Sequence, residues 1–518
     1  MATRVSSPLF IGRQTELGIL TEAVDRAAAG MASTILIGGD AGIGKTRLVT
    51  ELAAHASAAG ALVLEGGCVA LGDGGGLPFA PIVEALRRLP SILAREPDGA
   101  LGVADLRSPA TAELGRLIPE LGASSGADVA TFDRPEWIQA RIFEGLLTLL
   151  RLLSEHRPVV LILEDLHWAD GSTRDVTSFL ARNARAERLL VIGTYRTDEL
   201  NRRHPLRPWL SEMERLPRVT GIELSRFGRA ELDAQVAAIL DHAPPPGLVD
   251  NVERRTEGNP FFVEELLAAS AGQPRDRLPQ TLRDVLLTRV TSLSEEAQRV
   301  LGIAAVAGRR VRTELLSAVA GMPETELEAA LREALASQII VTDTSMGVDA
   351  YRFRHALLAE AVYDDLLPSE RRRLHAAYAA VLESQPVRGG AEGASLLSAL
   401  AHHASAAHEP TRALRAWIGA ARAAEAAFAF PVSMNAYERA IDLWDAVPAD
   451  DRPRGIDAAA LHFEASLAAN LTGRSERAVE FARMAVSLID RRSDVERWAA
   501  ANERLARVSW VSGSMDEG

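Results

Sequence analysis

The stretch TILIGGDAGIGKT, residues 34–46, decides the fold, because an apolar run leads directly into a glycine-rich turn that ends in Lys-Thr. The turn has the spacing GxxxxGK[ST], which begins at Gly39 and ends at Gly44, Lys45 and Thr46. A phosphate-binding loop requires a strand before it and a helix after it, and the helical run RLVTELAAHASAA follows here. A chance glycine turn is the alternative, and this context argues against it. The stretch therefore predicts an α/β domain whose parallel sheet carries a P-loop.

The residues of this loop are suited to hold a nucleotide and its metal ion. Because glycine has no Cβ, Gly39, Gly42 and Gly44 allow a tight bend that directs several backbone N–H groups at one anion. Lys45 would place its charge at the β- and γ-phosphates, and the Thr46 hydroxyl would bind Mg²⁺. Lys45 is also the single lysine, since the 57 Lys plus Arg residues include 56 arginines. A planar guanidinium would not replace its compact ammonium in such a loop. We therefore expect ATP or ADP, with Mg²⁺, as cofactors.

Composition and charge limit the class of protein. At about 150 residues per domain, 518 residues predict three or four domains, and 47% hydrophobic with 25% charged residues is ordinary for globular domains. A net charge of −13 argues against a non-specific nucleic-acid binder, because that affinity comes from neutralising phosphates. The single Cys68 allows no intrachain disulfide, and neither a signal-like N-terminus nor an apolar run near the ~18 residues of a membrane span is present. We expect a soluble, cytoplasmic protein without a membrane partner.

A second chemical element is PVVLILEDLHWAD, residues 158–170, which follows a long amphipathic helix predicted to begin at Pro135. Five consecutive apolar residues predict a strand buried on both faces of a parallel sheet, with Glu164 and Asp165 at the carboxyl end, where such sheets bind ligands. One carboxylate would hold Mg²⁺ and the other would orient a water for attack on the γ-phosphate. By position we assign Glu164 to the metal and Asp165 to the water, and the reverse assignment stays open. Asp170 is expected to cap the helix that follows it.

A further buried strand, RLLVIGTYR, residues 188–196, ends in two polar side chains. Thr194 and Arg196 would reach the γ-phosphate if this strand neighbours the one that carries the two carboxylates. An arginine after a strand is, by itself, equally typical of a solvated surface position. Arg196 is therefore a candidate catalytic residue with a surface role as the alternative.

Seven stretches together give the chain a resemblance to a known family. In chain order they are FIGRQTEL, GDAGIGKTRL, VLILEDLHWAD, VIGTYR, EGNPFFVEELL, LPQTLRDVLLTRVTSLS and FRHALLAEAVYDDL. They keep the family's order over about residues 9–380, which is far more specific than a single P-loop. The chain resembles STAND-class signal-transduction ATPases, and most closely the nucleotide-binding part of the large ATP-binding LuxR-type transcriptional regulators.

The resemblance implies roles for individual residues. Arg13 and its neighbours would border the adenine, and Pro260 in EGNP would pack near the base. Arg47, which follows the P-loop threonine in GDAGIGKTRL, would join the nucleotide-binding residues. Arg196 would be the sensor arginine.

Two further positions bear on how the nucleotide is read. In the family, the histidine at the position of His355 contacts the β-phosphate of bound ADP, and the alternative is an ordinary histidine that caps a helix. Family members often have Asp-Asp where this chain has Glu164-Asp165. This departure leaves nucleotide binding better supported than catalysis.

Pattern and resemblance together predict four domains after a short tail. We expect a tail (1–8), a P-loop nucleotide-binding domain (9–224), a helical domain (225–277), a winged helix (278–367) and TPR-like helical repeats (368–518). The winged helix is expected because helices are followed by the strand pair in SQIIVTDTSMGVDAYRFR. The resemblance implies that it packs on the nucleotide domain as part of a switch.

The repeats are predicted from alanine-rich helical pairs beyond Pro368, which have small residues where paired helices would cross. Three histidines, His402, His403 and His408, fall on one of these helices. Because adjacent residues on a helix do not share a face, we expect them to face solvent and not to bind a metal. The repeat pattern stops at Gly518 after the first helix of a pair, which favours a truncated chain.

These expectations combine into an ATP/ADP-controlled switch. ADP would hold the domains closed, ATP would release them and allow self-association, and an inducer ligand or protein would bind the repeats. The resemblance places a DNA-binding helix-turn-helix at the C-terminus of full-length relatives, so DNA would be a partner only through that absent module. Two alternatives stay open: an ATPase module fused to a cyclase or kinase effector, and a stand-alone turnover ATPase. ATP hydrolysis is expected to be slow in the switch.

Overall fold

The computed structural model of the protein describes residues 7–71, 75–93, 106, 111–118, 135–202, 204–270, 282–343 and 349–512. Its internal contacts separate the chain into two compact units. The first unit consists of Met1–Gly67, Leu150–His167 and Ala181–Arg371. The second unit consists of Cys68–Leu149, Trp168–Leu180 and Arg372–Gly518.

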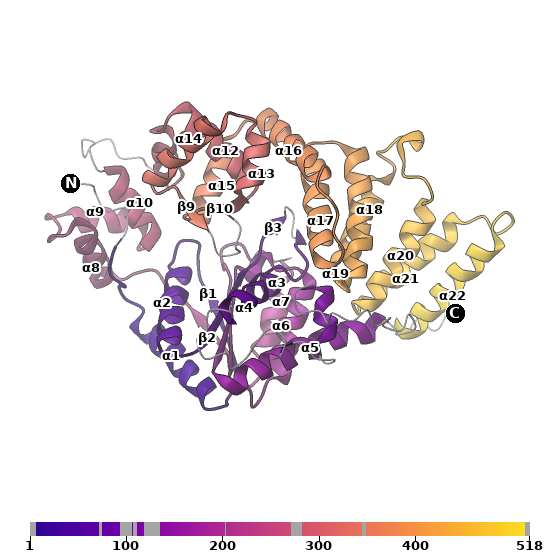
Figure 1. The fold of residues 1–518 in the computed structure, drawn as a ribbon, viewed down its shortest axis with the longest axis horizontal. Helices are drawn as coiled ribbons and strands as arrows, with labels where there is room; N and C mark the ends of the chain where they lie inside the picture. The colour runs from indigo at the N-terminus through magenta and orange to yellow at the C-terminus, as the bar shows by residue number, and fades with distance from the viewer. Residues whose placement is uncertain are drawn as a thin grey trace. The chain divides into compact units, whose positions relative to one another are not determined.

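The first unit is built on a five-stranded parallel sheet with the strand order β2-β5-β6-β1-β7, and β1 and β2 are labelled in Figure 1. The strands are β1 (Ser33–Gly38), β2 (Leu62–Gly67), β5 (Val159–Glu164), β6 (Leu189–Thr194) and β7 (Val219–Glu223). In the register, Ile35 of β1 lies beside Ile192 of β6 and Thr220 of β7. Runs of apolar residues form these strands because a parallel sheet is buried on both faces. The predicted α/β class is therefore confirmed, and β5 and β6 are neighbours as expected.

Two helices cover the sheet next to the P-loop. Helix α1 (Gln14–Ala28) and helix α2 (Lys45–Ala58) share one apolar cluster with β1, β5 and β6. Leu20 of α1 and Leu48 and Leu52 of α2 are fully buried in it, at the helical spacing of three to four residues. This packing fixes the start of α2, and therefore Lys45, at the end of β1.

Helix α7 (Leu206–Met213) also belongs to the first unit, whereas most of α5 (Pro135–His156) and most of α6 (Gly171–Asn183) belong to the second. Helix α5 begins at Pro135, as predicted from the fixed φ angle that suits proline to a first helical turn. Asp170 accepts hydrogen bonds through Oδ1 from the backbone N–H groups of Ser172, at 2.8 Å, and Thr173, at 3.2 Å. The expected capping role of Asp170 is confirmed.

The remainder of the first unit is mostly helical. Helices α8 (Arg229–Leu240), α9 (Leu248–Thr256) and α10 (Pro260–Ser270) share a small apolar cluster of their own. They are followed by α11 (Leu282–Thr291), α12 (Glu295–Val306), α13 (Thr313–Ala320), α14 (Glu324–Ala336) and α15 (Ala356–Asp365). Between these helices, β8 (Arg310–Arg312), β9 (Ile340–Asp343) and β10 (Ala350–Phe353) form an antiparallel sheet in the order β8-β10-β9.

The second unit is a series of helices with one short hairpin. Its elements are β3 (Ala70–Leu71), β4 (Gly75–Gly76), α3 (Ala80–Arg87), α4 (Leu89–Leu93), α16 (Pro368–Glu383), α17 (Gly390–Ala406), α18 (Pro410–Ala426), α19 (Phe430–Trp444), α20 (Ala458–Leu471), α21 (Ser475–Leu488) and α22 (Val495–Ser512), with short 3₁₀ turns at Ala112–Arg116 and Ala449–Asp451. Consecutive helices from α17 to α22 pack on one another. The predicted helical region is confirmed.

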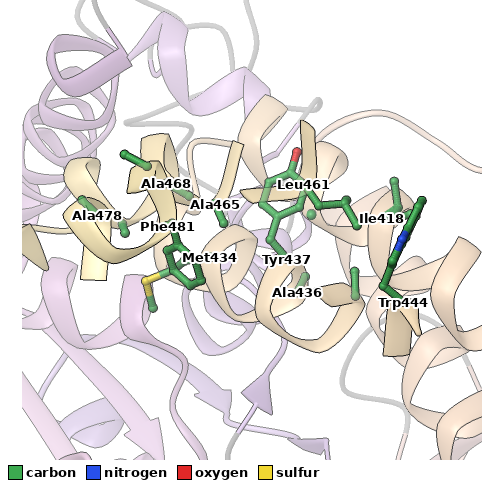
Figure 2. Packing of buried hydrophobic residues seen from close by; sticks show 14 of the residues in the cluster. Ile418, Met434, Ala436, Tyr437, Trp444, Leu461, Ala465, Ala468, Ala478 and Phe481 are labelled. Atoms are coloured by element: carbon green, nitrogen blue, oxygen red, sulfur yellow. The ribbon is translucent and has the colours of Figure 1, made fainter. Parts of the chain in front are cut away.

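The helix pairs of the second unit pack through small residues. One apolar cluster joins α18 to α22 and contains many fully buried alanines. Figure 2 shows Ala436 and Ala465 of this cluster near the larger side chains of Tyr437 and Phe481. Alanine at the crossings lets the helix backbones approach closely, as the sequence pattern predicted. In the ranges that the structure describes, no helix is long and apolar enough to cross a lipid bilayer.

The expectation that His402 and His403 face solvent is wrong. His403 of α17 is buried, at 6% exposure, and His402 is half-buried. The expectation relied on adjacent helical residues pointing in different directions, but α17 packs beside α16, and the rings of both His402 and His403 contact His375 of that helix. His408 lies in the turn after α17 and is exposed, as expected.

Candidate functional site

The glycine-rich loop joins the end of β1 to the start of α2, and three of its glycines have positive φ angles. The φ values are 150° at Gly39, 76° at Gly42 and 102° at Gly44. A Cβ at Gly42 would lie 2.8 Å from Cβ of Phe261, so this position also requires glycine for space. The loop can therefore bend and approach α10 only because side chains are missing there.

Lys45 is the first residue of α2 and is 8% exposed. Its Nζ donates hydrogen bonds to the carbonyl oxygens of Gly39, at 2.7 Å, and Asp40, at 2.9 Å. Burial lowers the pKa of Lys45 to about 8, although the charge of Asp165 opposes this shift. Because burial disfavours the positive charge of Lys45, an anionic ligand beside Lys45 would be favoured, since its negative charge would stabilise the charged amine.

Thr46 and Arg47 follow Lys45 on the exposed side of the helix start. Arg47 forms an ion pair with Glu51 one helical turn later, at 2.9 Å. Both residues line the same cavity as the loop. The Thr46 hydroxyl is an oxygen donor of the kind that Mg²⁺ prefers.

A cavity of about 450 Å³ lies in the first unit over the loop, within the size range of ligand pockets. Its wall comes from the loop, the segment before α1, the start of α10 and the region from Arg309 to Leu357. The lining includes two carboxylates, Asp165 and Glu264. The cationic lining residues are Arg13, Lys45, Arg47, Arg196, Arg309, Arg352 and Arg354. This excess of positive charge suits a polyanionic ligand such as a nucleotide.

The two predicted carboxylates differ in position. Asp165 lines the cavity, whereas Glu164, the last residue of β5, is not among the lining residues. The backbone N–H of Asp165 donates to Oγ1 of Thr194 at 3.0 Å, and its carboxylate is paired with Arg309. Burial raises the pKa of Glu164, and the charge of Arg309 opposes this shift. Asp165 is thus the carboxylate that a ligand in this cavity would meet.

Arg196 also lines the cavity and is 6% exposed. Its Nη1 is paired with Glu199 and donates to Glu360 of α15, at 2.8 Å. The alternative of a solvated surface arginine is therefore wrong. Thr194 contacts Asp165 through its hydroxyl but does not line the cavity.

Arg13 and Pro260 both lie on the cavity wall. The guanidinium of Arg13 is paired with the carbonyl oxygen of Ser225 and lies over the ring of Phe227, 5.1 Å from its centroid. Pro260 is the first residue of α10, and its carbonyl oxygen accepts a hydrogen bond from Gln235 at 2.9 Å. The residues that the family resemblance assigns to the nucleotide base thus line the same cavity as the loop.

His355 precedes α15, and its ring packs on Phe261 with centroids 4.1 Å apart. Within the described chain, its side chain makes no hydrogen bond that would cap α15, so the alternative role of His355 as a capping side chain is wrong. The Nε2 atom is buried and has no hydrogen-bond partner among the residues that the structure describes, and His355 lines the cavity. Burial lowers the pKa of His355 to about 3, which keeps the ring neutral near pH 7. A buried polar atom of this kind is suited to a ligand.

Three contacts of the site were not foreseen from the sequence. Arg309 and Glu360 pair with Asp165 and Arg196, and no spacing in the sequence indicated either residue. Asn259 accepts from the backbone N–H of Phe261 at 3.1 Å and donates to the carbonyl oxygen of Ala41 at 2.9 Å. An asparagine before a helix is a capping signal, but its second contact, to the P-loop, has no signal in the sequence.

Comparisons with known proteins agree with this geometry. The family model of the AAA ATPase domain matches residues 9–192. An uncharacterized protein of Rhizobium meliloti (strain 1021) is 26% identical over 492 residues, which cover 88% of this chain and 45% of that protein. This chain thus spans less than half of the length of that relative.

Two solved structures resemble this chain weakly in sequence and in fold. A Signal Transduction ATPase with Numerous Domains (STAND) protein with a tetratricopeptide repeat sensor from Pyrococcus horikoshii aligns over 98% of this chain and 69% of its own, at 15% identity and a TM-score of 0.47. Drosophila ORC bound to DNA aligns over 69% of this chain and 87% of its own, at 14% identity and a TM-score of 0.29. TM-scores this low do not establish a shared function. The family match, together with the strand, the glycine loop and Lys45 at the start of a helix, shows that residues 9–192 are similar to the AAA ATPase domain and carry a P-loop.

Proposed function

We propose that this chain is a nucleotide-controlled switch of the STAND class. The observation that carries the proposal is the composition of one cavity wall: P-loop residues and residues from Arg309 to Leu357 line the same space. A nucleotide in this space would contact both parts. Its affinity would then depend on whether they are closed on one another, which is the requirement for a ligand to shift a conformational equilibrium.

Two ion pairs support a restrained, closed form. Arg309 pairs with Asp165, and Glu360 of α15 pairs with Arg196. Asp165 and Arg196 are the residues that we expect to act on the γ-phosphate. While both pairs are formed, each of these side chains already has an opposite charge beside it. Movement of Arg309 and α15 away from the P-loop would remove both of these pairs, and Arg196 would keep its pair with Glu199.

His355 is proposed to read the diphosphate. Its unpartnered Nε2, as an N–H donor, would bind an oxygen of the β-phosphate of ADP. The neutral ring has one N–H, so one such hydrogen bond is available. This contact would favour the closed form in the ADP state.

Mg²⁺ fits the oxygen donors present beside the loop. The Thr46 hydroxyl and one carboxylate of the Glu164–Asp165 pair would hold it, and Asp165 is favoured because it lines the cavity. When bound, Mg²⁺ neutralises charge on the transferred phosphate. Arg196 would stabilise the remaining negative charge, and Glu164, which does not line the cavity in this closed form, would orient water only after the site opens. Hydrolysis is proposed to be slow and to reset the switch.

The resemblance of the seven sequence stretches supports a finer proposal, that the switch belongs to a LuxR-type transcriptional regulator. In this proposal, an inducer ligand or protein acts on helices α16 to α22, and the ATP state self-associates. We assign no DNA contact to the described residues.

Calorimetric titration of ADP and ATP tests the nucleotide site. Lys45→Ala should weaken both nucleotides by about 10- to 100-fold, because hydrogen bonds to charged groups contribute about 1.5–3 kcal/mol each. Arg26→Ala is a matched control, because it also removes one positive charge but at a surface pair with Glu22 on α1, outside the cavity lining. Equal affinities of wild type and Lys45→Ala would remove the assignment.

A further inference from the structure

Three histidines meet in the second unit, away from the nucleotide cavity. His375 lies on α16, and His402 and His403 lie on α17. One ring nitrogen from each lies within 4.8 Å of the other two. Packing of α16 against α17 thus brings together side chains that are 27 and 28 positions apart in the sequence.

The distances are close to those of a metal site. The Nδ1 atoms of His375 and His403 are 2.8 Å apart, and the ring centroids of His402 lie 5.7 Å and 5.3 Å from those of His375 and His403. Two imidazole nitrogens bound to a tetrahedral Zn²⁺ at about 2.0–2.1 Å are separated by about 3.3 Å. The 2.8 Å separation of His375 and His403 is shorter than this spacing and the 4.8 Å limit for the three histidines is longer, so metal binding would require the rings to turn.

The surroundings fix two of the rings and leave a route to the third. His375 is 2% exposed and His403 is 6% exposed, whereas His402 is half-buried. The ring of Tyr378 stacks on His403, with centroids 4.9 Å apart and planes inclined by 15°. Burial lowers the pKa of His403, so that its ring is neutral, and neutral imidazole is the form that binds metals.

A hydrogen bond between His375 and His403 alone is the competing explanation. At 2.8 Å, one Nδ1 can donate to the other when their tautomers differ. That hydrogen bond involves two of the three rings, whereas ligand atoms of all three histidines lie within 4.8 Å of one another, and a metal ion would use all three.

We propose that His375, His402 and His403 bind a divalent transition-metal ion. Imidazole donors suit Zn²⁺, Cu²⁺, Ni²⁺ and Fe²⁺ and do not suit Mg²⁺ or Ca²⁺. Within the described part of the chain, no carboxylate or thiol joins the three histidines, so one coordination position stays open for water or an added ligand. The ion links α16 to α17 in the region where we place the inducer, and the proposal stands independently of the nucleotide switch.

Cobalt is the first probe, because Co²⁺ with a low coordination number absorbs visible light. Untagged full-length protein, treated with a chelator and free of nucleotide, is titrated with Co²⁺ and then with Zn²⁺. We expect visible bands that saturate at one Co²⁺ per chain and disappear when Zn²⁺ is added. Absence of these bands in the wild-type protein would overturn the proposal and leave the His375–His403 hydrogen bond as the explanation.

Two variants make the assignment specific. His402→Ala should weaken Zn²⁺ binding at least about 100-fold, since loss of even a supporting residue around a metal ligand costs about 10–100-fold. His408→Asn is the matched control, because His408 is exposed in the turn after α17 with a positive φ angle that asparagine tolerates. Circular dichroism and melting without metal verify folding, and His402→Gln replaces His402→Ala if the latter melts early. Unchanged Zn²⁺ affinity in a folded His402 variant would overturn the proposal.

Discussion

Replacing Arg309 with glutamine should loosen the region that covers the P-loop cavity. Arg309 Nη1 is paired with Oδ2 of Asp165, and the two side chains are only 20% and 13% exposed. Glutamine keeps hydrogen-bonding capacity but removes the positive charge. Asp165 would then remain mostly buried beside β5 without this partner.

The expected magnitude follows from this burial. An exposed ion pair contributes about 0–1 kcal/mol, whereas a hydrogen bond to a charged group contributes about 1.5–3 kcal/mol. Because both side chains are mostly enclosed, we expect the second range. Since about 1.4 kcal/mol corresponds to a tenfold change, the opening equilibrium should rise about 10- to 140-fold.

Hydrogen exchange of the protein without nucleotide measures this opening. The backbone N–H of Phe353 donates to the carbonyl oxygen of Arg309 at 2.9 Å, so the amides of β8 and β10 report on this segment. Amides that exchange through the opening should exchange faster by the same factor. Arg332→Gln is the control, because the side chain of Arg332 on α14 is 73% exposed and pairs with the surface residue Glu328.

A double variant sharpens the test. If the pair is responsible, Arg309→Gln combined with Asp165→Asn should exchange no faster than Arg309→Gln alone, because residues in contact are not additive. Wild-type exchange rates in Arg309→Gln, or effects that simply add in the double variant, would refute the reasoning.

Three further predictions concern the cavity. Asp165→Asn should lose Mg²⁺-dependent ATP binding, because Asp165 lines the cavity and Glu164 does not. Glu164→Gln should keep this binding but lose hydrolysis. The opposite pattern in titration and turnover assays would restore the assignment of Glu164 to the metal and Asp165 to the water. His355→Ala should weaken ADP at least about tenfold and ATP less, because it removes one hydrogen bond to a charged phosphate; equal losses in calorimetry would contradict this role. Burial raises the pKa of Glu264 to about 7, so this residue of the cavity wall gains negative charge between pH 6 and 8. The affinity for ADP should therefore fall up to about tenfold over this range. Glu264→Gln should flatten this dependence of affinity on pH, and identical pH dependence in the variant and the wild type would refute the prediction.

Local patterns predicted the parts of the molecule that depend on neighbours in sequence. The glycine spacing and the apolar run before it located the loop, because both are properties of thirteen consecutive residues. The cap at Asp170 and the start of α5 at Pro135 were predicted for the same reason. The parallel pairing of β5 with β6 followed from strands that are apolar throughout.

Contacts between distant segments could not be predicted in this way. Arg309 lies 144 positions from Asp165, and its stretch AGRRVR has no periodicity that singles out one arginine. Glu360 lies on an ordinary helix and reaches Arg196 only because α15 is placed there by its own packing. The resemblance to a family predicted a contact of His355 with the β-phosphate, whereas the burial of its Nε2 atom could be seen only in the structure.

The single lysine has a practical consequence for chemistry at the P-loop. Among the side chains of these 518 residues, only that of Lys45 can form an amide with an amine-reactive ester. With its pKa lowered to about 8, Lys45 carries a reactive unprotonated amine at mildly alkaline pH, although its Nζ is shielded by two carbonyl oxygens of the loop. Labelling of this amine with and without nucleotide, measured by mass spectrometry, would therefore report whether nucleotide occupies the cavity in the protein without any substitution.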